Sequence, residues 1–244
     1  AQRHKLDIEQ IIDWQSKLLP VAGEFAGLKI KDARAKIVDK LKAKGLLIKI
    51  DENYTTVVKK CYKCNSMIEP QIKDQWFVKM ESLAKLALEA VDKGQVKFVP
   101  DNYEKVFHYW LEHALDWNIS RQIVWGIPIP AWLCDECHEG TASLGAETPK
   151  CRTCGKAMRR DTDTFDTWFS SGQWPLLTLN YPASEDYKKY YPTSVMETGH
   201  DLIFRWIPRM VIFGLYLAKQ VPFQTVYLHG LVNDAQGKKM SKSK

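Results

Sequence analysis

Hydrophobic residues recur at helical spacing in three segments of the first half of the chain. In residues 31–44 they fall on one helical face, Asp32 stands at a capping position, and Gly45 follows the last turn. The same spacing occurs in 80–93, which ends before Gly94, and in 101–114, where Asp101 and Glu104 have the spacing of a capping box. These patterns predict three amphipathic helices. Their inward-facing residues are predicted to be Ala33, Ile37, Val38, Leu41, Leu83, Leu86, Ala87, Val91, Phe107, Trp110 and Leu111.

Short apolar runs bounded by turn residues predict β-strands. Residues 46–60 are expected to form one or two strands around a turn at 51–53. Residues 194–199 and 223–229 are expected to form two more. The segment between them is predicted to be a helix that Asp201 caps, that bends at Pro208 and that ends at about Lys219. Strand, helix and strand in this order predict a βαβ unit with parallel strands and a right-handed crossover.

The carboxyl ends of parallel strands are where ligands bind in such sheets. This rule places Gly199 and Asp201 beside His229 and Gly230, and the start of the helix offers free N–H groups. The chain then runs through a polar turn into a lysine- and serine-rich stretch, 238–244. Lysines there can gather around a polyphosphate and neutralise charge as pyrophosphate leaves. A solvated basic tail is the alternative interpretation.

Composition limits the class of protein without choosing one. The chain has 244 residues, 45% of them hydrophobic, which is enough for one large domain with a substantial core. A net charge of +6 is compatible with a nucleic-acid partner. The most apolar run, 202–218, contains Arg205, Pro208 and Arg209, so no membrane span is expected. No signal-peptide pattern is present, and a cytoplasmic protein is expected.

Six cysteines form three C-x-x-C pairs, which indicate metal binding rather than disulfides. The second and third pairs are separated by thirteen residues, as in a four-cysteine zinc ribbon. Four thiolates leave no coordination position for water, so a structural zinc is predicted. Cys61 and Cys64 form either a second site or two ordinary thiols. The four predicted ligands are Cys134, Cys137, Cys151 and Cys154.

Three aspartates, Asp161, Asp163 and Asp166, lie close together in the sequence. They suggest a magnesium site, and equally a capped turn before a helix. The sequence alone leaves both interpretations open.

Several motifs occur in one order and together resemble those of class I aminoacyl-tRNA synthetases of the valyl type. Residues 120–132 resemble an SRQ-x-x-WG-x-x-IPAW segment, and 166–171 read DTWFSS. Residues 199–206 read GHDLIFRW, and 239–243 spell KMSKS. Residues 1–6 and 25–28 resemble the closing part of the editing domain of the same enzymes. The resemblance therefore extends over essentially the whole chain.

The resemblance implies an α/β fold, with the second half of a Rossmann-like (HUP-type) parallel-sheet catalytic domain in residues 59–244. A zinc ribbon is inserted at 132–158, and residues 1–58 would be the remnant of the editing domain. The implied reaction is ATP-dependent activation of valine, with Mg²⁺, followed by transfer to tRNA(Val). Catalysis would use Lys242, assisted by Lys239. The resemblance assigns ATP binding to Gly199, Asp201, His229, Gly230, Val232, Lys239, Ser241 and Lys242, and the valine pocket to Trp168, Leu202 and Trp206.

Two features keep alternatives open. Residues 124–127 read VWGI where valyl enzymes more usually carry WWGH, which favours an isoleucyl type, whereas Leu202 favours valine. No histidine is followed by x-Gly-His, so the HIGH motif is missing. The resemblance then implies a chain that is inactive until an amino-terminal half supplies HIGH. A zinc-bearing RNA-binding module without catalysis is the other alternative.

Overall fold

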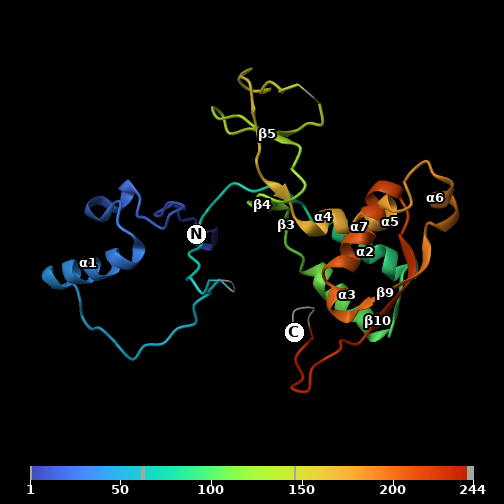
Figure 1. The fold of residues 1–244 in the computed structure, drawn as a ribbon, viewed down its shortest axis with the longest axis horizontal. Coiled ribbons are helices and arrows are strands. Elements are labelled where there is room, and N and C mark those ends of the chain that lie inside the picture. The colour runs from blue at the N-terminus through green and yellow to red at the C-terminus, as the bar shows by residue number, and fades with distance from the viewer. Residues whose placement is uncertain (1, 62–63, 146, 241–244) are drawn as a thin grey trace. The chain divides into compact units, whose positions relative to one another are not determined.

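The structure, a computed structural model, describes residues 2–61, 64–145 and 147–240 (Figure 1). The chain divides into two compact units, Ala1–Asp74 and Gln75–Lys244. Each unit has its own internal contacts, and each is described by itself below.

The first unit contains little regular structure. It has two 3-10 helices, η1 (Gln2–His4) and η2 (Pro20–Phe25), and one α-helix, α1 (Ile30–Ala43). Helix α1 confirms the prediction over 31–44, and Gly45 follows it with φ of +67°. The predicted cap is wrong, because Lys29 is the N-cap residue and Asp32 lies inside the first turn.

The predicted strands in 46–60 do not form in the first unit. These residues pair only through one isolated bridge, between Lys60 and Met67. Ile48 and Val57 are fully exposed, at 100% and 99% of their surface. A strand needs a partner to satisfy its backbone groups, and none of the described residues of this unit supplies a continuous one.

A three-stranded parallel sheet organises the second unit. Its order is β2 (Lys97–Val99), β10 (Phe223–His229) and β9 (Thr193–Gly199). Strands β9 and β10 confirm the two strands predicted from the sequence, and their parallel pairing confirms the βαβ interpretation. Buried Phe223, Val226 and Leu228 alternate with more exposed residues on β10.

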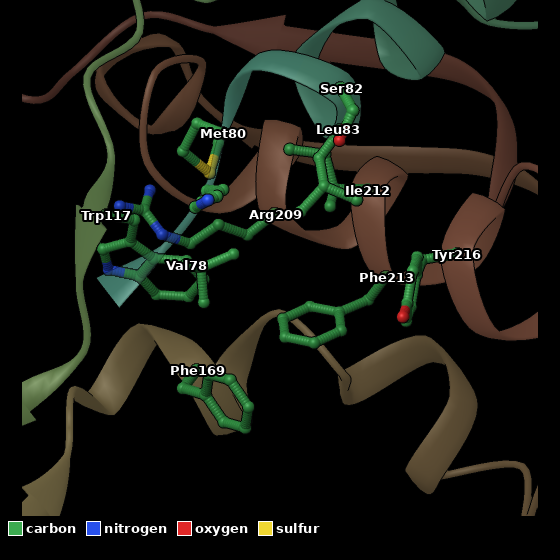
Figure 2. Close-up of a pocket in the computed structure, with 11 residues that line it drawn as sticks. Val78, Met80, Ser82, Leu83, Trp117, Phe169, Arg209, Ile212, Phe213 and Tyr216 are labelled. Carbon is green, nitrogen blue, oxygen red and sulfur yellow. The ribbon is translucent and has the colours of Figure 1, made fainter. Parts of the chain in front are cut away.

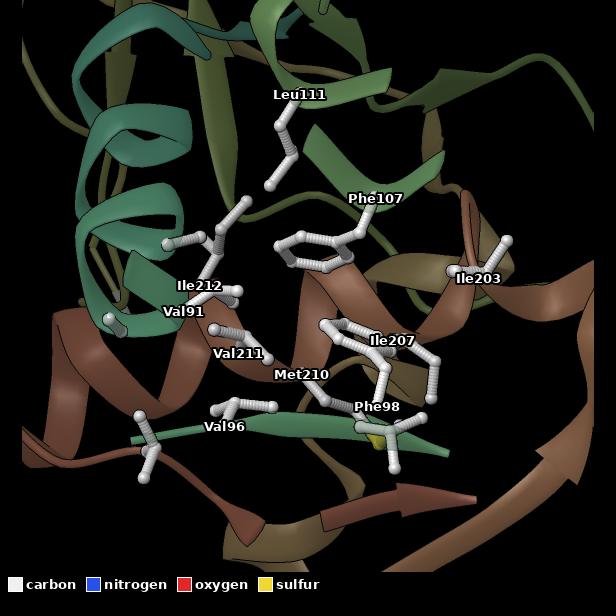
Figure 3. Close-up of a cluster of buried hydrophobic side chains, with 14 of the residues drawn as sticks. Val91, Val96, Phe98, Phe107, Leu111, Ile203, Ile207, Met210, Val211 and Ile212 are labelled. Atoms are coloured by element: carbon white, nitrogen blue, oxygen red, sulfur yellow. The ribbon is translucent and has the colours of Figure 1, made fainter. Parts of the chain in front are cut away.

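Three helices pack with this sheet around the main hydrophobic core: α2 (Glu81–Asp92), α3 (Asn102–Glu112) and α7 (Trp206–Phe213) (Figure 3). Helices α2 and α3 confirm the predicted amphipathic segments, although Asp101 makes no capping hydrogen bond. Four residues predicted to face inward are wrong. Ile37 and Leu41 of α1 are each 37% exposed. Leu86 is 43% exposed, and Trp110 is 48% exposed and stacks on Phe204 with ring centroids 4.9 Å apart.

The predicted single helix from Asp201 to Lys219 is divided into three pieces. A 3-10 turn, η3 (His200–Leu202), comes first, α7 follows, and a π-helical turn, η4 (Gly214–Ala218), ends the segment. Pro208 is the third residue of α7, where a backbone N–H would have no partner within the helix. It therefore belongs to the beginning of a helix and does not bend a longer one.

The remaining elements are short and build the region beside the sheet. Strand β1 (Phe77–Val78) pairs with β3 (Trp117–Asn118), and β4 (Ser120–Arg121) pairs with β8 (Thr164–Phe165), both antiparallel. A separate antiparallel sheet joins β6 (Gly140–Ala142), β5 (Ala131–Leu133) and β7 (Arg159–Arg160). The short helices are α4 (Thr167–Ser171), α5 (Trp174–Leu177) and α6 (Glu185–Tyr190). Across the described residues, none of the helices combines the length and apolar character that a membrane crossing requires.

Candidate active site

The ends of β9 and β10 form the centre of the candidate site. Gly199 and His229 are register partners at the last position of the ladder. His200 then turns back, and its Nδ1 lies 3.4 Å from the carbonyl oxygen of His229. On its other side, the His200 ring stacks against Tyr103 of α3, with centroids 6.1 Å apart. The structure therefore brings together the glycine turn and the strand end that the sequence placed side by side.

Space is tight at position 199. A Cβ there would lie 2.9 Å from Oδ1 of Asp201 and 3.0 Å from Cδ2 of Leu231. Both distances are shorter than ordinary contacts, so the side chains of Asp201 and Leu231 would have to shift to make room. Gly199 thus lets these two side chains lie close to the turn at the carboxyl edge of the sheet.

Asp201 contacts the lysine-rich segment instead of capping a helix. Its Oδ2 accepts a hydrogen bond from Nζ of Lys239 and forms an ion pair with it. This contact lowers the pKa of Asp201 from its ordinary value, although partial burial acts in the opposite direction. The predicted cap is therefore wrong. The partner found in its place is the first lysine of the KMSKS sequence.

A tight turn brings Lys239 back toward the strand ends. Oδ1 of Asp234 accepts hydrogen bonds from the backbone N–H groups of Gln236, at 3.0 Å, and Lys238, at 2.8 Å. Gly237 has φ of +75°, a conformation that favours glycine, and Met240 donates to the carbonyl oxygen of Val232 at 3.0 Å. The remaining predicted residues of this segment, Ser241 and Lys242, lie outside the described residues.

The three residues predicted to form the amino-acid pocket belong to α4, η3 and α7. Trp168, Leu202 and Trp206 are all half-buried. Trp206 donates from Nε1 to the carbonyl oxygen of Ser171 at 2.8 Å, which joins α7 to the end of α4. Its ring also meets the edge of Trp174, with centroids 6.3 Å apart. The elements that carry Trp168 and Trp206 are therefore held together directly.

Asp161, Asp163 and Asp166 are structural acceptors. Each is at most 9% exposed. Oδ2 of Asp161 accepts from the indole of Trp76 at 2.6 Å, and Oδ2 of Asp166 accepts from the indole of Trp117 at 2.9 Å. We call these three residues the aspartate ladder. Their bonds to indole and amide N–H groups give these carboxylates partners within the protein, which does not favour a magnesium site. The predicted helix cap is also wrong, because Asp166 makes no side-chain capping bond to α4.

The ladder also runs from the β5–β6–β7 sheet, where the N–H of Asp161 donates to the carbonyl oxygen of Ala131, to the start of α4. Oδ2 of Asp163 accepts from the amide of Gln122 at 2.6 Å. Asp166 is the N-cap residue of α4, and it forms an ion pair with Arg121 at 3.1 Å. The sequence motif around 166–171 therefore begins at a buried anchor, which sequence reasoning did not identify.

The four cysteines predicted to bind zinc lie together at the far end of this sheet. Their sulfur atoms are all within 4.8 Å of one another. A tetrahedral zinc with Zn–S bonds of about 2.3 Å holds its sulfurs about 3.8 Å apart. The observed Sγ–Sγ distances of 3.4 Å for Cys134–Cys154, 3.3 Å for Cys137–Cys151 and 3.8 Å for Cys137–Cys154 fit that geometry.

Hydrogen bonds favour the thiolate form at two of the four cysteines. The N–H of Cys137 lowers the pKa of Cys134, and the N–H of Cys154 lowers the pKa of Cys151 to about 6. Hydrogen bonds between the sulfurs raise the pKa of the other two, Cys137 and Cys154. Thiolate is the form that binds metal, so the cluster could hold a zinc ion. The first pair differs, because no third His, Cys, Asp or Glu among the described residues joins Cys61 and Cys64. A second metal site there stays a prediction.

The parallel β2–β10–β9 sheet with helices packed around it is an α/β fold of the kind that binds ligands at the carboxyl ends of its strands. A similar fold occurs in a crystal structure of Mycobacterium tuberculosis methionyl-tRNA synthetase bound by methionyl-adenylate. That match has a TM-score of 0.51 at 15% identity and covers 76% of this chain and 32% of the other. At this identity the likeness concerns the fold alone.

The family model for class I tRNA synthetases (I, L, M and V) matches residues 7–244, and the chain belongs to this family. It is 45% identical over 245 residues to a valine--tRNA ligase of Pseudothermotoga lettingae, and 49% identical over 243 residues to one of Carboxydothermus hydrogenoformans. It covers 28% and 27% of the length of these relatives, which cover 100% and 99% of this chain.

These relatives do not favour the isoleucyl or leucyl alternative. The VWGI departure that suggested it lies on an exposed loop, where Trp125 is 92% exposed. It is therefore a surface difference, outside the contacts described above for the strand ends, α4 and α7.

Proposed function

We propose that this chain is the segment of a valine--tRNA ligase that binds ATP and valine, with the reaction completed by the HIGH-bearing half of such an enzyme. The observation that carries the proposal is the contact between Asp201 and Lys239 beside the ends of β9 and β10. It joins the turn proposed to bind adenosine to the signature lysine segment. The similarity of the whole chain to valine--tRNA ligases supports the same assignment.

The proposed nucleotide site uses backbone at the strand ends and charge from the lysine segment. Adenosine would lie against the backbone of Gly199 and Gly230, with the exposed side chains of His229 and Val232 beside it. The phosphates, with Mg²⁺, would be held by Lys239, Ser241 and Lys242. Lysine charge placed where negative charge develops stabilises the departure of pyrophosphate.

In this proposal Lys239 binds either the carboxylate of Asp201 or the phosphates of ATP. In the described structure its ammonium is paired with Asp201, in a contact that is exposed to solvent on the lysine side. An exposed pair of this kind is worth roughly 0–1 kcal/mol, so a polyphosphate can replace the carboxylate at small cost. Lys239 would then be held near the site before ATP binds and released to the phosphates afterwards.

The proposed valine pocket lies between α4 and α7, with Trp168, Leu202 and Trp206 as its walls. An aliphatic Leu202 suits a branched apolar substrate, because it leaves no polar group unpaired. Size exclusion in such a pocket distinguishes one methylene by only about 1–3 kcal/mol, so a separate editing step is expected in the complete enzyme. Residues 1–58 are proposed to be the end of that editing domain, and 59–244 the second half of the catalytic domain.

The remaining parts of the proposal concern zinc and tRNA. Zinc bound by the four clustered cysteines would be structural, because a four-thiolate site has no open position. It would hold residues 132–158 as a ribbon, next to the segment that the aspartate ladder joins to Trp76 and Gln122. The proposed partner is tRNA(Val), and the proposed location is the cytoplasm.

Valine-dependent exchange between ATP and pyrophosphate tests the proposal. The 244-residue chain alone is expected to show negligible exchange, because one side of the phosphate clamp is missing and positioning supplies most of the rate. Addition of an amino-terminal synthetase piece that carries HIGH should restore exchange with valine, and much less with leucine. Lys239→Ala is expected to reduce the restored rate. Robust exchange by the chain alone, or a restored preference for isoleucine, would contradict the proposal.

A further inference from the structure

A cavity of about 360 Å³ opens in the second unit between α2, α4 and α7 (Figure 2). Apolar side chains form most of its wall, among them Leu83, Trp117, Phe169 and Phe213. The volume lies in the range of sites for small organic ligands. Among the described residues that line it, none is acidic, whereas Arg209 and the exposed Lys79 are basic.

Arg209 places a positive charge against this apolar wall. Its guanidinium lies over the ring of Trp117, 4.4 Å from the centroid, and it donates to the carbonyl oxygen of Arg205. Nε of Arg209 is buried and has no hydrogen-bond partner. Desolvation lowers the pKa of Arg209, which means that burial makes its positive charge less stable than it is in water.

No carboxylate of the described residues forms a salt bridge with Arg209. The acidic group that acts on it is Asp166, which already accepts from the indole of Trp117 and pairs with Arg121. A half-buried guanidinium that lines an apolar cavity and has no salt-bridge partner in the described part of the chain is a site where an anion can pair with it, because charge-assisted hydrogen bonds are worth more than neutral ones. The cavity therefore combines one cationic position with walls that suit an apolar body.

None of the three residues proposed for the valine pocket lines this cavity. Phe169 lines it, whereas its neighbour Trp168 does not. On α7, Arg209 and Phe213 line it, whereas Trp206 does not. Helices α4 and α7 therefore present different residues to this cavity and to the proposed valine pocket.

We propose that this cavity binds a small organic acid that has an apolar, ring-sized body and a carboxylate paired with Arg209. A purely apolar ligand would leave the guanidinium without an anion, and a small hydrophilic anion would leave the apolar walls uncovered. The competing occupant is protein, that is, apolar side chains of another segment that fill the same space. The inference concerns binding alone and does not rest on the proposed function.

The test compares a carboxylic acid with its neutral counterpart on the complete 244-residue chain. 3-Phenylpropionate and 3-phenylpropan-1-ol have the same ring and chain length and differ in charge. Binding is followed through the indole N–H signal of Trp117 in a nitrogen-15 spectrum, assigned by its loss in Trp117→Phe. We expect a saturable shift with the acid, and at least about tenfold weaker binding of the alcohol, the size of effect that one charge-assisted hydrogen bond can give.

Two variants locate the charge. Arg209→Met is expected to weaken binding of the acid to the level of the alcohol, while Lys105→Met, at an exposed position of α3 that does not line the cavity, should leave it unchanged. If Arg209→Met alters folding, the comparison of acid and alcohol on the unaltered chain decides alone. Equal binding of the two compounds, or no saturable shift with either, would overturn the proposal. A shift that Trp168→Ala removes and Arg209→Met does not would place the ligand in the neighbouring pocket, with the same consequence.

Discussion

At the scale of single residues, Asp201 shows how a partner far away in the sequence decides what a side chain does. Its position before an apolar helical pattern suggests a cap, but its carboxylate binds Lys239, thirty-eight residues away. An ammonium offers a charged donor, whereas a helix N-terminus offers partial charges. The acidic residue of the site is consequently paired with the lysine segment.

The Asp201–Lys239 contact predicts a pH dependence at the acidic end. The folded-state pKa of Asp201 is lowered, so the contact is complete above the ordinary value of about 3.9 and is lost as pH falls through the lower folded value. Asp201→Asn should remove the dependence and free the 232–240 turn at all pH values. Faster trypsin cleavage after Lys238 and Lys239 at pH 7 would report this release. Glu197→Gln, at an exposed position of β9, is the control and should cleave like the unaltered chain.

The tryptophans of α4 and α7 carry the prediction for valine selectivity. In a complete synthetase that contains this segment, Trp168→Ala and Trp206→Ala should weaken valine binding much more than ATP binding. Leu202→Gln should cost about 1–3 kcal/mol of valine binding, because a buried amide is left without partners. Equilibrium binding of valine and of ATP separates the two effects. Trp125→Ala, at a 92% exposed indole, should change neither, and unchanged valine affinity in all three pocket variants would place the pocket elsewhere.

At the scale of elements, the cysteine cluster predicts one zinc per chain. Cys151→Ser should lose the zinc, because three thiolates and a hydroxyl no longer form the closed four-sulfur site. Cys64→Ser is the matched control at an exposed cysteine of the first pair. Metal analysis of both variants checks the assignment. Full zinc content in Cys151→Ser would refute it, and half the content in Cys64→Ser would reveal a second site.

The aspartate ladder predicts a difference between two substitutions at one position. Asp166→Ala leaves the indole of Trp117 and the guanidinium of Arg121 without their acceptor, and should destabilise the second unit by about 1–3 kcal/mol. Asp166→Asn keeps an acceptor for the indole and should cost less. Denaturant unfolding of both, beside Asp186→Asn at an exposed position, measures the difference. Equal stability of the alanine variant and the control would show that the ladder does not hold α4.

At the scale of the whole molecule, the two units differ in how they are stabilised. The hydrophobic core that joins sheet and helices consists only of residues of the second unit, and so does the small cluster around the cysteines. Among the described residues of the first unit, Ala33 is the one fully buried hydrophobic side chain. Buried apolar area is the main source of folding free energy, so the second unit has most of it.

This difference predicts the result of dividing the chain at Asp74 and Gln75. Residues 75–244 alone should unfold cooperatively, with the same zinc content as the complete chain. Residues 1–74 alone should show no cooperative transition. Calorimetry of the two pieces and of the whole chain makes the comparison. A sharp transition in the first piece would mean that it has a core of its own.

Much of the fold could be predicted from the sequence, because it depends on local periodicity. The helical spacing in 80–93 and 101–114 predicted α2 and α3, and the apolar runs before Gly199 and Gly230 predicted β9 and β10. The spacing of the cysteines predicted their cluster. Each of these features depends on residues that are close together in the sequence, so the local pattern is enough to predict it.

Other features were decided only by tertiary structure. Periodicity tells which face of a helix is apolar, but Leu86 and Trp110 lie where no element covers them fully. The apolar run in 46–60 has the composition of a strand, yet a strand forms only when a second one supplies hydrogen bonds. Arg209 gained its place beside a cavity from the way α2, α4 and α7 meet. Partners distant in sequence compete for each polar group, and that competition is resolved only when the chain is folded.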